Sequence, residues 1–307
     1  MSSYHYHDPV LFEEAISYLV VHPEGVYCDG TLGGGGHFSG ILEKLNKHGT
    51  LIGIDRDPEA VQHCRERFKK SGSDIHFYQG AFGDIERIVQ KTGVKLLDGL
   101  LLDLGISSRQ IDHPARGFSY LKAGPLDMRM DTQASLTAYD ILHSYSEAAL
   151  ADLFFYYGEE RKARRIAKKI VISRNRIPLE TTLDLANLVR TMIPGHRVNK
   201  SLSRIFQALR IEVNDELAQL KSVLIQAGDL LNSRGRLVVI AYHSLEDRLV
   251  KRFLKGEELS FLRQEMAERV QPRQFRLLTK KVVRPSSEEV ERNSRARSAR
   301  LRAAEKL

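Results

Sequence analysis

Short apolar runs alternate with helix-like patterns along the first third of the chain. Four apolar runs have the length of a strand, and they span 25–28, 50–54, 75–79 and 97–104. Three segments between them repeat apolar side chains every three or four positions, as helices with one buried face do, at 38–45, 58–70 and 84–91. This alternation predicts an α/β fold in which a parallel sheet carries helices on both faces.

A long interruption separates these strands from the next one. The following strand pattern, 236–242, starts more than a hundred residues after 97–104, whereas a crossover between parallel strands needs only one helix and two short loops. The intervening patterns are helical, at 139–143, 147–156, 159–174 and 182–192, with Pro178 and Pro194 as breakers. The sequence therefore predicts an inserted small all-helical domain.

Two domains follow from this organisation. We expect the sheet domain to combine residues 1–115 and 203–307, and the helical domain to span 116–202. A single helix over 211–231 should return the chain to the sheet. The extended pattern at 275–283 should add an antiparallel edge strand.

Composition narrows the class of protein. With 307 residues, 42% of them hydrophobic, the chain can bury a sizeable core. The two cysteines, Cys28 and Cys64, indicate buried thiols in a reducing compartment and no disulfide framework. No metal site is predicted, because the cysteines are solitary and His5, His7 and Asp8 form only a loose group. No apolar run reaches the roughly 18 residues of a membrane span, and no signal peptide is evident, so we expect a cytoplasmic protein.

The net charge of +8 favours a polyanionic partner, and basic residues cluster in two places. The segment 161–176 holds eight basic and no acidic residues, interleaved with apolar ones at helical spacing. The second cluster lies in an expected mobile C-terminal tail and consists of Arg292, Arg295, Arg297, Arg300 and Arg302. Both clusters suit nucleic acid, although each would also serve as a solvated face. The aromatic residues at 154–157 are expected in the core.

A glycine-rich loop, 29–37, joins the first predicted strand to the first predicted helix. Glycine allows positive φ angles and lets a ligand approach the main chain closely. Gly33, Gly35 and Gly36 are therefore candidate contacts for a nucleotide-like cofactor. The alternative is a flexible turn without a ligand.

The spacing and charge of the loop distinguish between cofactors. The G-x-G-x-x-G pattern of dinucleotide sites is incomplete, because Phe38 or Ser39 stands where the third glycine belongs. Asp29 at the loop entrance instead suits the sulfonium and ammonium charges of S-adenosylmethionine. Asp55, at the end of the second strand, is placed to accept hydrogen bonds from a ribose, or alternatively to cap the helix that starts near Pro58.

Several polar or aromatic residues follow strand ends, which meet at one edge of a parallel sheet. They are Asp29, Asp55, Phe82 and Asp103. Phe82 suits packing against an adenine, and an ordinary core position is the alternative. After Asp103, the hydroxyl groups of Ser107 and Ser108 would lie near a target amine, unless they only form a serine-rich turn.

A second polar group, led by His243, follows the strand predicted at 236–242. His243 is a candidate to accept or relay a proton. Ser244 and Asp247 are expected to cap the next helix. A hydrolase built from Ser244, His243 and Asp103 is disfavoured, because the chain has no G-x-S-x-G elbow.

Three motifs resemble those of the RsmH (MraW) family, at 29–37, 54–58 and 101–108. Five further segments extend the resemblance over nearly the whole chain, at 116–119, 124–131, 157–161, 206–211 and 243–248. Gly34 and a shorter segment at 253–273 depart from the family pattern. The resemblance implies a Rossmann-like S-adenosylmethionine methyltransferase sheet, with cofactor contacts at Gly35, Gly36, His37, Asp55, Phe82, Asp103 and Gln110.

Members of this family are bacterial 16S ribosomal RNA cytosine-N4 methyltransferases. The resemblance therefore implies S-adenosylmethionine as cofactor, the small ribosomal subunit as partner and one cytidine of its decoding region as target. The helical insert would help to present the RNA. Candidates to accept a hydrogen of the amine are Asp103, Ser107, Ser108 and His243. A nicotinamide dehydrogenase and a non-catalytic RNA-binding protein that keeps the loop are the alternatives.

Overall fold

The computed structural model describes residues 9–259 and 274–307, and the chain divides into two compact units. Unit 1 combines Met1–Gly105 with Leu217–Leu307, and unit 2 is Ile106–Glu216. The units thus place 106–115 and 203–216 with the helical insert, whereas the predicted domains join them to the sheet. The physical reason is that helix α10 (Val198–Asn214) is continuous and packs along α6, α7 and α9 of unit 2.

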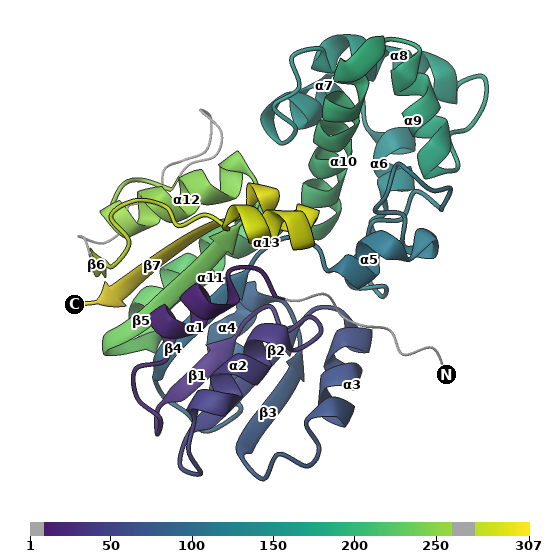
Figure 1. Cartoon of the computed structure of the whole chain (residues 1–307). Helices are drawn as coiled ribbons and strands as arrows, with labels where there is room; N and C mark the ends of the chain where they lie inside the picture. The colour runs from purple at the N-terminus through teal and green to yellow at the C-terminus, as the bar shows by residue number, and fades with distance from the viewer. Residues whose placement is uncertain (1–8, 260–273) are drawn as a thin grey trace. The chain divides into compact units, whose positions relative to one another are not determined.

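Unit 1 is built on a seven-stranded sheet with the order β3-β2-β1-β4-β5-β7-β6 (Figure 1). The strands are β1 (Val26–Asp29), β2 (Thr50–Asp55), β3 (Asp74–Gln79), β4 (Leu97–Asp103), β5 (Leu231–Ala241), β6 (Phe275–Leu277) and β7 (Arg300–Lys306). The first five pair in parallel, and β6 and β7 run antiparallel. The direction in which successive strands are added reverses between β1 and β4, and ligands of such sheets bind at that point, outside the carboxyl ends.

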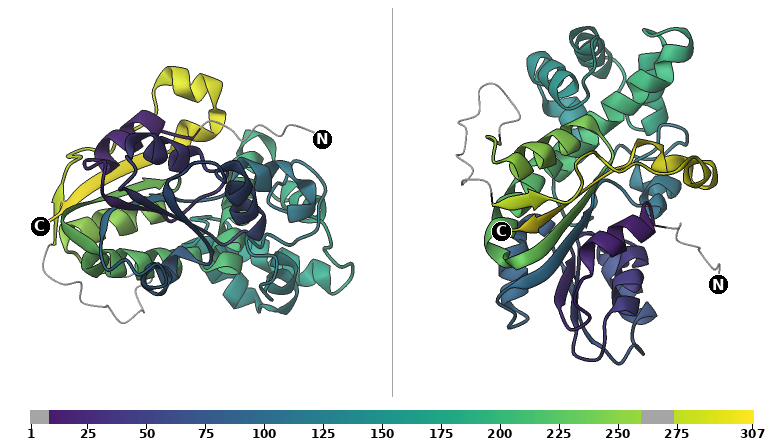
Figure 2. Two further views of the ribbon diagram at one scale, coloured as in Figure 1. Left: turned by 90° about the horizontal axis from the view of Figure 1, so that it is seen from below. Right: turned by 60° about the vertical axis from the view of Figure 1, so that its left-hand side comes forward.

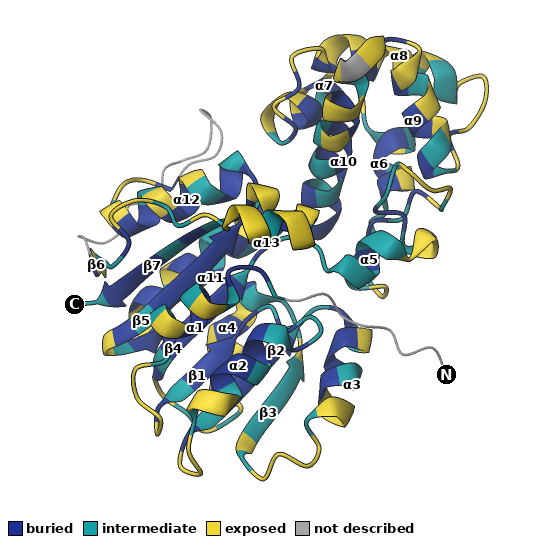
Figure 3. Cartoon of the chain, in the orientation of Figure 1, coloured by how far each residue is buried: buried dark blue, intermediate teal, exposed yellow. Residues whose placement is uncertain are grey.

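Helices cover both faces of this sheet because its central strands are apolar on both sides (Figure 3). Leu101 packs in a core that includes residues of α1 and α2, whereas Leu100 and Leu102 pack in a core with α4, α11 and α12. The helices of unit 1 are α1 (Phe12–Leu19), α2 (Gly36–Lys44), α3 (Pro58–Arg67), α4 (Ile85–Gln90), α11 (Glu216–Leu230), α12 (Ser244–Lys255) and α13 (Ser287–Arg292), with 3-10 turns η1 (Phe82–Asp84) and η4 (Ser294–Ser298). The predicted α/β architecture is confirmed, as are the buried free thiols of Cys28 and Cys64.

Unit 2 is helical and has its own core. Its helices are α5 (Ser108–Asp112), α6 (Ala138–Ser144), α7 (Glu147–Tyr156), α8 (Ala163–Arg174), α9 (Thr182–Arg190) and α10, with 3-10 turns η2 (Pro114–Arg116) and η3 (Gly195–Arg197). Phe154, Ile166 and Leu209 lie fully buried at its centre. The prediction of an all-helical insert between β4 and β5 is therefore confirmed. Within the described ranges, no helix has both the length and the apolarity that a membrane crossing requires.

The prediction of one helix over 211–231 is wrong. Asp215 adopts a left-handed conformation with φ of 51°, which ends α10 and lets α11 begin at Glu216. Aspartate is among the few residues that enter this region at modest cost. The apolar periodicity continues across the break, so the pattern alone does not reveal it.

The C-terminal arginines do not form a mobile tail, and that prediction is wrong for Arg300 and Arg302. Both lie in β7, which is inserted between β5 and β6 (Figures 1 and 2). Asp247 on α12 accepts a 2.7 Å hydrogen bond from Nε of Arg302 and lies 3.6 Å from Nη1 of Arg300. The antiparallel edge strand predicted at 275–283 is present as the three-residue β6. Two charges of the predicted RNA-binding cluster are thus part of the sheet.

Candidate functional site

The carboxyl ends of β1 and β4 are joined by Thr31, the third residue of the glycine-rich loop. The Asp29 side chain, which is buried, accepts a 3.0 Å hydrogen bond from the Thr31 amide. The Thr31 hydroxyl oxygen accepts a 2.6 Å bond from the Asp103 amide. The loop therefore starts at a fixed point where the sheet order reverses, with two carboxyl groups beside it.

Asp55 fixes the next part of the loop. One of its carboxylate oxygens accepts a 2.7 Å hydrogen bond from the Gly33 amide, and the other accepts a 2.8 Å bond from the Asp57 amide. Helix α3 is capped by Asp57, which accepts from the Glu59 amide at 3.0 Å, so the alternative role of Asp55 as that cap is wrong. Each carboxylate oxygen keeps a second lone pair, so Asp55 can still accept from a ligand hydroxyl.

Gly35 must be glycine for two reasons. Its φ of 76° lies in the left-handed region, and a Cβ atom there would stand 2.8 Å from the Phe68 ring and 3.0 Å from Sγ of Cys64. Gly33, with φ of 48°, is also left-handed. The loop is thus shaped and held by specific contacts, which does not fit the alternative of an unconstrained turn.

Three acidic side chains end three neighbouring strands, β2, β1 and β4. Burial raises the pKa of Asp29 to about 6, and the negative charges of Asp103 and Asp55 add to that rise, while His37 and the Thr31 amide oppose it. Burial likewise raises the pKa of Asp55 to about 6 and that of Asp103 to about 7. Carboxylates that are costly to ionise in isolation become favourable beside a cation, so this edge of the sheet suits a positively charged ligand.

His37, on the first turn of α2, contacts the carboxyl group of Asp103. Its Nδ1 lies 3.5 Å from Oδ2 of Asp103, and its Nε2 lies 3.0 Å from the carbonyl oxygen of Val10. Tyr242, which follows β5, donates a 2.9 Å hydrogen bond from its hydroxyl group to Oδ1 of Asp103. Burial lowers the pKa of His37 and raises that of Tyr242, so both are neutral near pH 7.

Residues 4–307 match the family described as the MraW methylase family. The chain belongs to this family. The chain is 47% identical to ribosomal RNA small subunit methyltransferase H of Chloroherpeton thalassium, over 98% of this chain and 99% of that protein. It is 44% identical to the protein of the same name from Caldicellulosiruptor saccharolyticus, with the same two coverages. A solved rRNA methylase from Streptococcus thermophilus gives a TM-score of 0.43 at 12% identity, covering 96% of this chain and 93% of that one.

Membership of the MraW methylase family confirms the resemblance to RsmH (MraW) proteins and makes the chain a methyltransferase. The unit 1 sheet is accordingly a Rossmann-like methyltransferase sheet. Among the predicted cofactor contacts, unit 1 brings Gly33, Asp55, His37 and Asp103 together through the bonds described above. Phe82 begins η1 after β3, is half-buried, and has its Cβ near Gly30 of the loop. Its position suits both predicted roles, ligand contact and core packing.

The remaining predicted residues after β4 lie in unit 2, where they form the start of α5. The Ser107 hydroxyl oxygen accepts a 3.2 Å hydrogen bond from the Gln110 amide, and Oε1 of Gln110 accepts a 3.0 Å bond from the Ser107 amide. This reciprocal pair is a capping box, which gives Ser107 and Gln110 a structural role at the start of α5. Ser108 is half-buried as the first residue of the helix. Their functional roles stay predictions.

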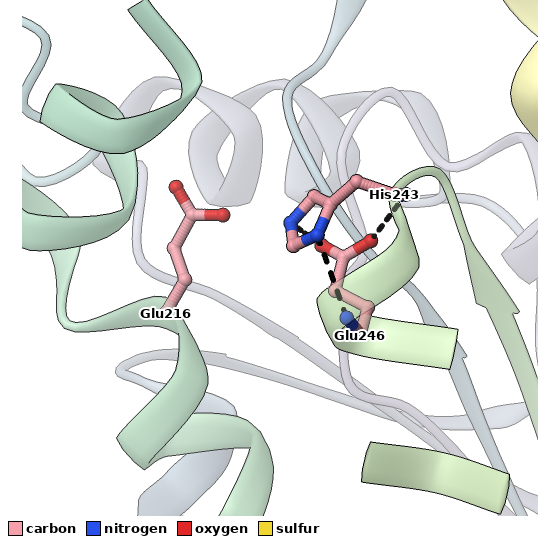
Figure 4. A group of neighbouring side chains, drawn as sticks. All are labelled: Glu216, His243 and Glu246. Atoms are coloured by element: carbon pink, nitrogen blue, oxygen red, sulfur yellow. Dashed lines mark hydrogen bonds and ion pairs between the residues drawn. The ribbon is translucent and has the colours of Figure 1, made fainter. Parts of the chain in front are cut away.

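His243 also caps a helix, and the predicted capping pair of Ser244 and Asp247 is wrong. Nδ1 of His243 accepts from the Glu246 amide at 3.4 Å, and Oε2 of Glu246 accepts from the Tyr242 amide at 2.8 Å and the His243 amide at 3.1 Å. Figure 4 shows the two side chains together, with Nε2 of His243 3.1 Å from Oε1 of Glu246. Glu216, also drawn there, is bound by Arg210 at 2.7 Å. The capping bond engages Nδ1 of His243, whereas Nε2 makes no hydrogen bond to the described residues, and the predicted proton transfer by this imidazole remains a prediction.

The basic segment 161–176 forms an exposed face on unit 2. Helix α8 buries Ala163, Ile166, Ala167 and Ile170 and exposes the basic side chains between them (Figure 3). The exposed basic residues of the segment are Arg161, Lys162, Arg164, Arg165, Lys168, Lys169 and Arg176, which together we name the α8 basic face. Arg174 instead donates to the carbonyl oxygens of Leu142 and Tyr145.

Two aromatic residues expected in the core are exposed. Phe154 is buried and Tyr157 packs against the unit 2 core, as predicted, but Phe155 and Tyr156 are 55% and 42% exposed. Their rings meet edge to face at the end of α7, with centroids 5.1 Å apart. The helical period explains the difference, because consecutive residues of a helix cannot all face one core.

The sequence patterns assign no site role to Thr31, Tyr242 or Glu246. Tyr242 was the last residue of a predicted strand, and its partner Asp103 is 139 positions away, so no local pattern marks the contact. Glu246 follows His243 by three residues, which is the spacing of a capping box, but histidine is not among the residues preferred as helix caps. The group His5, His7 and Asp8 lies outside the described residues.

Proposed function

We propose that the protein is an S-adenosylmethionine-dependent methyltransferase that methylates the N4 amine of a specific cytidine in the decoding region of 16S ribosomal RNA. The observation that carries the proposal is the match to the MraW methylase family over residues 4–307, with full-length relatives named ribosomal RNA small subunit methyltransferase H. The geometry of unit 1 supports the cofactor, and the charge of unit 2 supports the RNA.

S-adenosylmethionine supplies a methyl group on a positively charged sulfur. The residues of unit 1 that would hold it are the loop glycines Gly33, Gly35 and Gly36, with His37, Asp55, Phe82 and Asp103. Gln110, which lies in unit 2, is the further predicted contact. These residues fit S-adenosylmethionine, because three acidic side chains at adjoining strand ends favour a cation. A nicotinamide dinucleotide would bring phosphates toward the same carboxylates, which disfavours the dehydrogenase alternative.

The α8 basic face is the proposed contact for RNA phosphates, since clustered exposed lysine and arginine bind such backbones through charge. We place the target cytidine outside the stacked helix when it reacts, because an enzyme cannot reach a base amine inside a duplex. The protein's task is then to hold the amine in line with the methyl group, and such positioning contributes much of a rate enhancement.

Binding of the cofactor is expected to release protons. Without the cofactor, Asp29 and Asp55 have pKa values of about 6, and a bound cation favours their ionised forms and lowers those values. Near pH 6, both groups are partly protonated before binding and less so after it, so affinity should rise between pH 5 and 7. Titration calorimetry in two buffers of different ionisation enthalpy measures the proton count. Proton uptake in that range would contradict the assignment.

The proposed function is tested in cells that lack the protein. Nucleoside mass spectrometry of their 16S ribosomal RNA should show that N4-methylated cytidine is lost and that it returns with the wild-type chain. An unchanged level would favour the alternative of a non-catalytic RNA-binding protein. Calorimetric titration with S-adenosylmethionine and, separately, with NAD distinguishes the methyltransferase from the dehydrogenase.

A further inference from the structure

Asp103 has the setting of a proton acceptor rather than only a ligand contact. Its side chain is 22% exposed, whereas its partner His37 is 5% exposed, so the carboxyl group is open to a ligand on one side and supported by protein on the other. The Tyr242 hydroxyl group donates to Oδ1, and Nδ1 of His37 lies 3.5 Å from Oδ2, so Oδ2 can still accept a hydrogen.

The contact with Val10 decides which nitrogen of His37 carries hydrogen. The Val10 carbonyl oxygen can only accept, so Nε2 of His37 is the protonated nitrogen. The neutral ring then turns the lone pair of Nδ1 toward Oδ2 of Asp103, 3.5 Å away. That lone pair repels a carboxylate and can accept a hydrogen bond from a carboxylic acid. The hydroxyl group of Tyr242 acts in the opposite sense, because its hydrogen bond stabilises the carboxylate.

We propose that the Asp103 carboxylate takes the proton released by the methylated amine, and that His37 and Tyr242 are positioning residues that set its basicity from opposite sides. The inference rests on the proposed function. The amine nitrogen forms a bond to the methyl carbon, while the carbon–sulfur bond breaks and its electron pair stays with sulfur. The nitrogen, now positive, gives one hydrogen as a proton to Oδ2 of Asp103. The cytosine is left with a neutral methylated amine, and Asp103 is left as a neutral carboxylic acid.

Other charged groups around Asp103 favour its role as a base. Asp29, at the end of β1, repels a negative charge on Asp103, and Glu246 of α12 does the same. The negative charge of Glu289, on α13, raises the pKa values of both His37 and Tyr242. With burial as the main cause, the pKa of Asp103 is about 7, so the group is partly ionised and still basic at neutral pH. A general base is most effective when its pKa lies near the working pH.

The test is the pH dependence of single-turnover methylation of unmethylated small ribosomal subunits at saturating S-adenosylmethionine. The wild-type rate should rise with pH as Asp103 loses its proton, at or below the pKa of about 7 that it has without the cofactor, because the bound cation lowers that value. Asp103→Asn should lower the plateau rate at least tenfold and remove that rise. Tyr242→Phe removes a donor to the carboxylate, so the rise should move to higher pH. His37→Ala removes the opposing lone pair and admits water, so the rise should move to lower pH.

Two control variants change the same residue types, a tyrosine and a histidine, at positions of the sheet that do not contact Asp103. Tyr27→Phe removes a hydroxyl group bonded to the His22 carbonyl, and His76→Ala removes a histidine 3.0 Å from Asp74. Both should keep the wild-type pH profile. A readout independent of turnover is the 15N spectrum of His37, which should show the neutral Nε2-protonated ring from pH 6 to 8, with His37→Ala assigning the signal.

The possible results distinguish a failure of the proposed methyltransferase function from a failure of the role proposed for Asp103. If the wild-type chain does not methylate the subunit, the proposed function fails. If it does, and Asp103→Asn keeps the plateau rate and the rise, Asp103 is not the acceptor. If Tyr242→Phe and His37→Ala leave the profile in place, or if the His37 ring is doubly protonated, the positioning roles are overturned.

Discussion

Replacing Arg164, Arg165, Lys168 and Lys169 together by glutamine is expected to weaken binding of small-subunit ribosomal RNA by roughly a hundredfold at about 0.15 M salt. All four side chains are exposed on the α8 basic face, while the apolar residues between them hold the helix to unit 2. Folding should therefore be unaffected, and the lost affinity should come from counterions that are no longer released. Equilibrium binding measured against salt concentration tests this directly.

The salt dependence gives the sharper number. Each phosphate contact to single-stranded RNA contributes about 0.7 to the slope of log K against log salt, so losing four contacts should reduce the slope by about 3. The control replaces Lys44, Lys47, Lys69 and Lys70 by glutamine. These are four exposed lysines of unit 1, at or just after the C-terminal ends of α2 and α3, and their replacement removes the same charge. If both variants lose equal affinity, net charge rather than the α8 basic face explains RNA binding.

Asp55→Ala is expected to weaken S-adenosylmethionine binding by about a hundredfold. The carboxylate accepts from the Gly33 and Asp57 amides, so its removal frees the loop and deletes the proposed acceptor for the ribose. A hydrogen bond to a charged group contributes about 1.5–3 kcal/mol, and 1.4 kcal/mol corresponds to tenfold. Titration calorimetry at pH 7.5, where Asp55 is ionised, measures the loss.

Two further variants make the Asp55 result specific. Asp55→Asn keeps one carbonyl oxygen, so it should lose less affinity than Asp55→Ala. Asp98→Ala is the matched control, because Asp98 also accepts two hydrogen bonds, from the Val26 amide and the Asn232 side chain, near the amino ends of the strands. It should reduce stability and leave the affinity unchanged. Wild-type affinity in Asp55→Ala would exclude this residue from cofactor binding.

Local patterns predicted much of the fold because they depend on nearby residues. The helix predicted at 147–156 is α7, and the strand predicted at 50–54 is β2 with Asp55 added. The failures depend on long-range or single-residue effects. β7 holds four charged residues among its seven, and it becomes a strand through its pairing with β5 and β6 and the contact between Arg302 and Asp247. The break at Asp215 is one backbone angle within a continuous apolar pattern.

The candidate site was predictable where it follows from topology. Asp29, Asp55 and Asp103 could be placed together because the carboxyl ends of parallel strands share one edge. The contacts that set the chemistry of Asp103 could not be predicted, because His37 and Tyr242 reach Asp103, and Val10 reaches His37, from distant segments of the chain. The hydrogen on His37 depends on one carbonyl group, and a sequence pattern carries no such information.

The interleaving of the two units has a consequence for the order in which the chain can fold during synthesis. When the ribosome has made Glu216, every residue of unit 2 exists, whereas the sheet still lacks β5, β7 and β6. Translation at about 5–20 residues per second needs on the order of 5–20 s more to reach β7. During that interval β4 has an open edge that only later residues can cover. Nascent chains should therefore fold the helical unit 2 first and complete the sheet last.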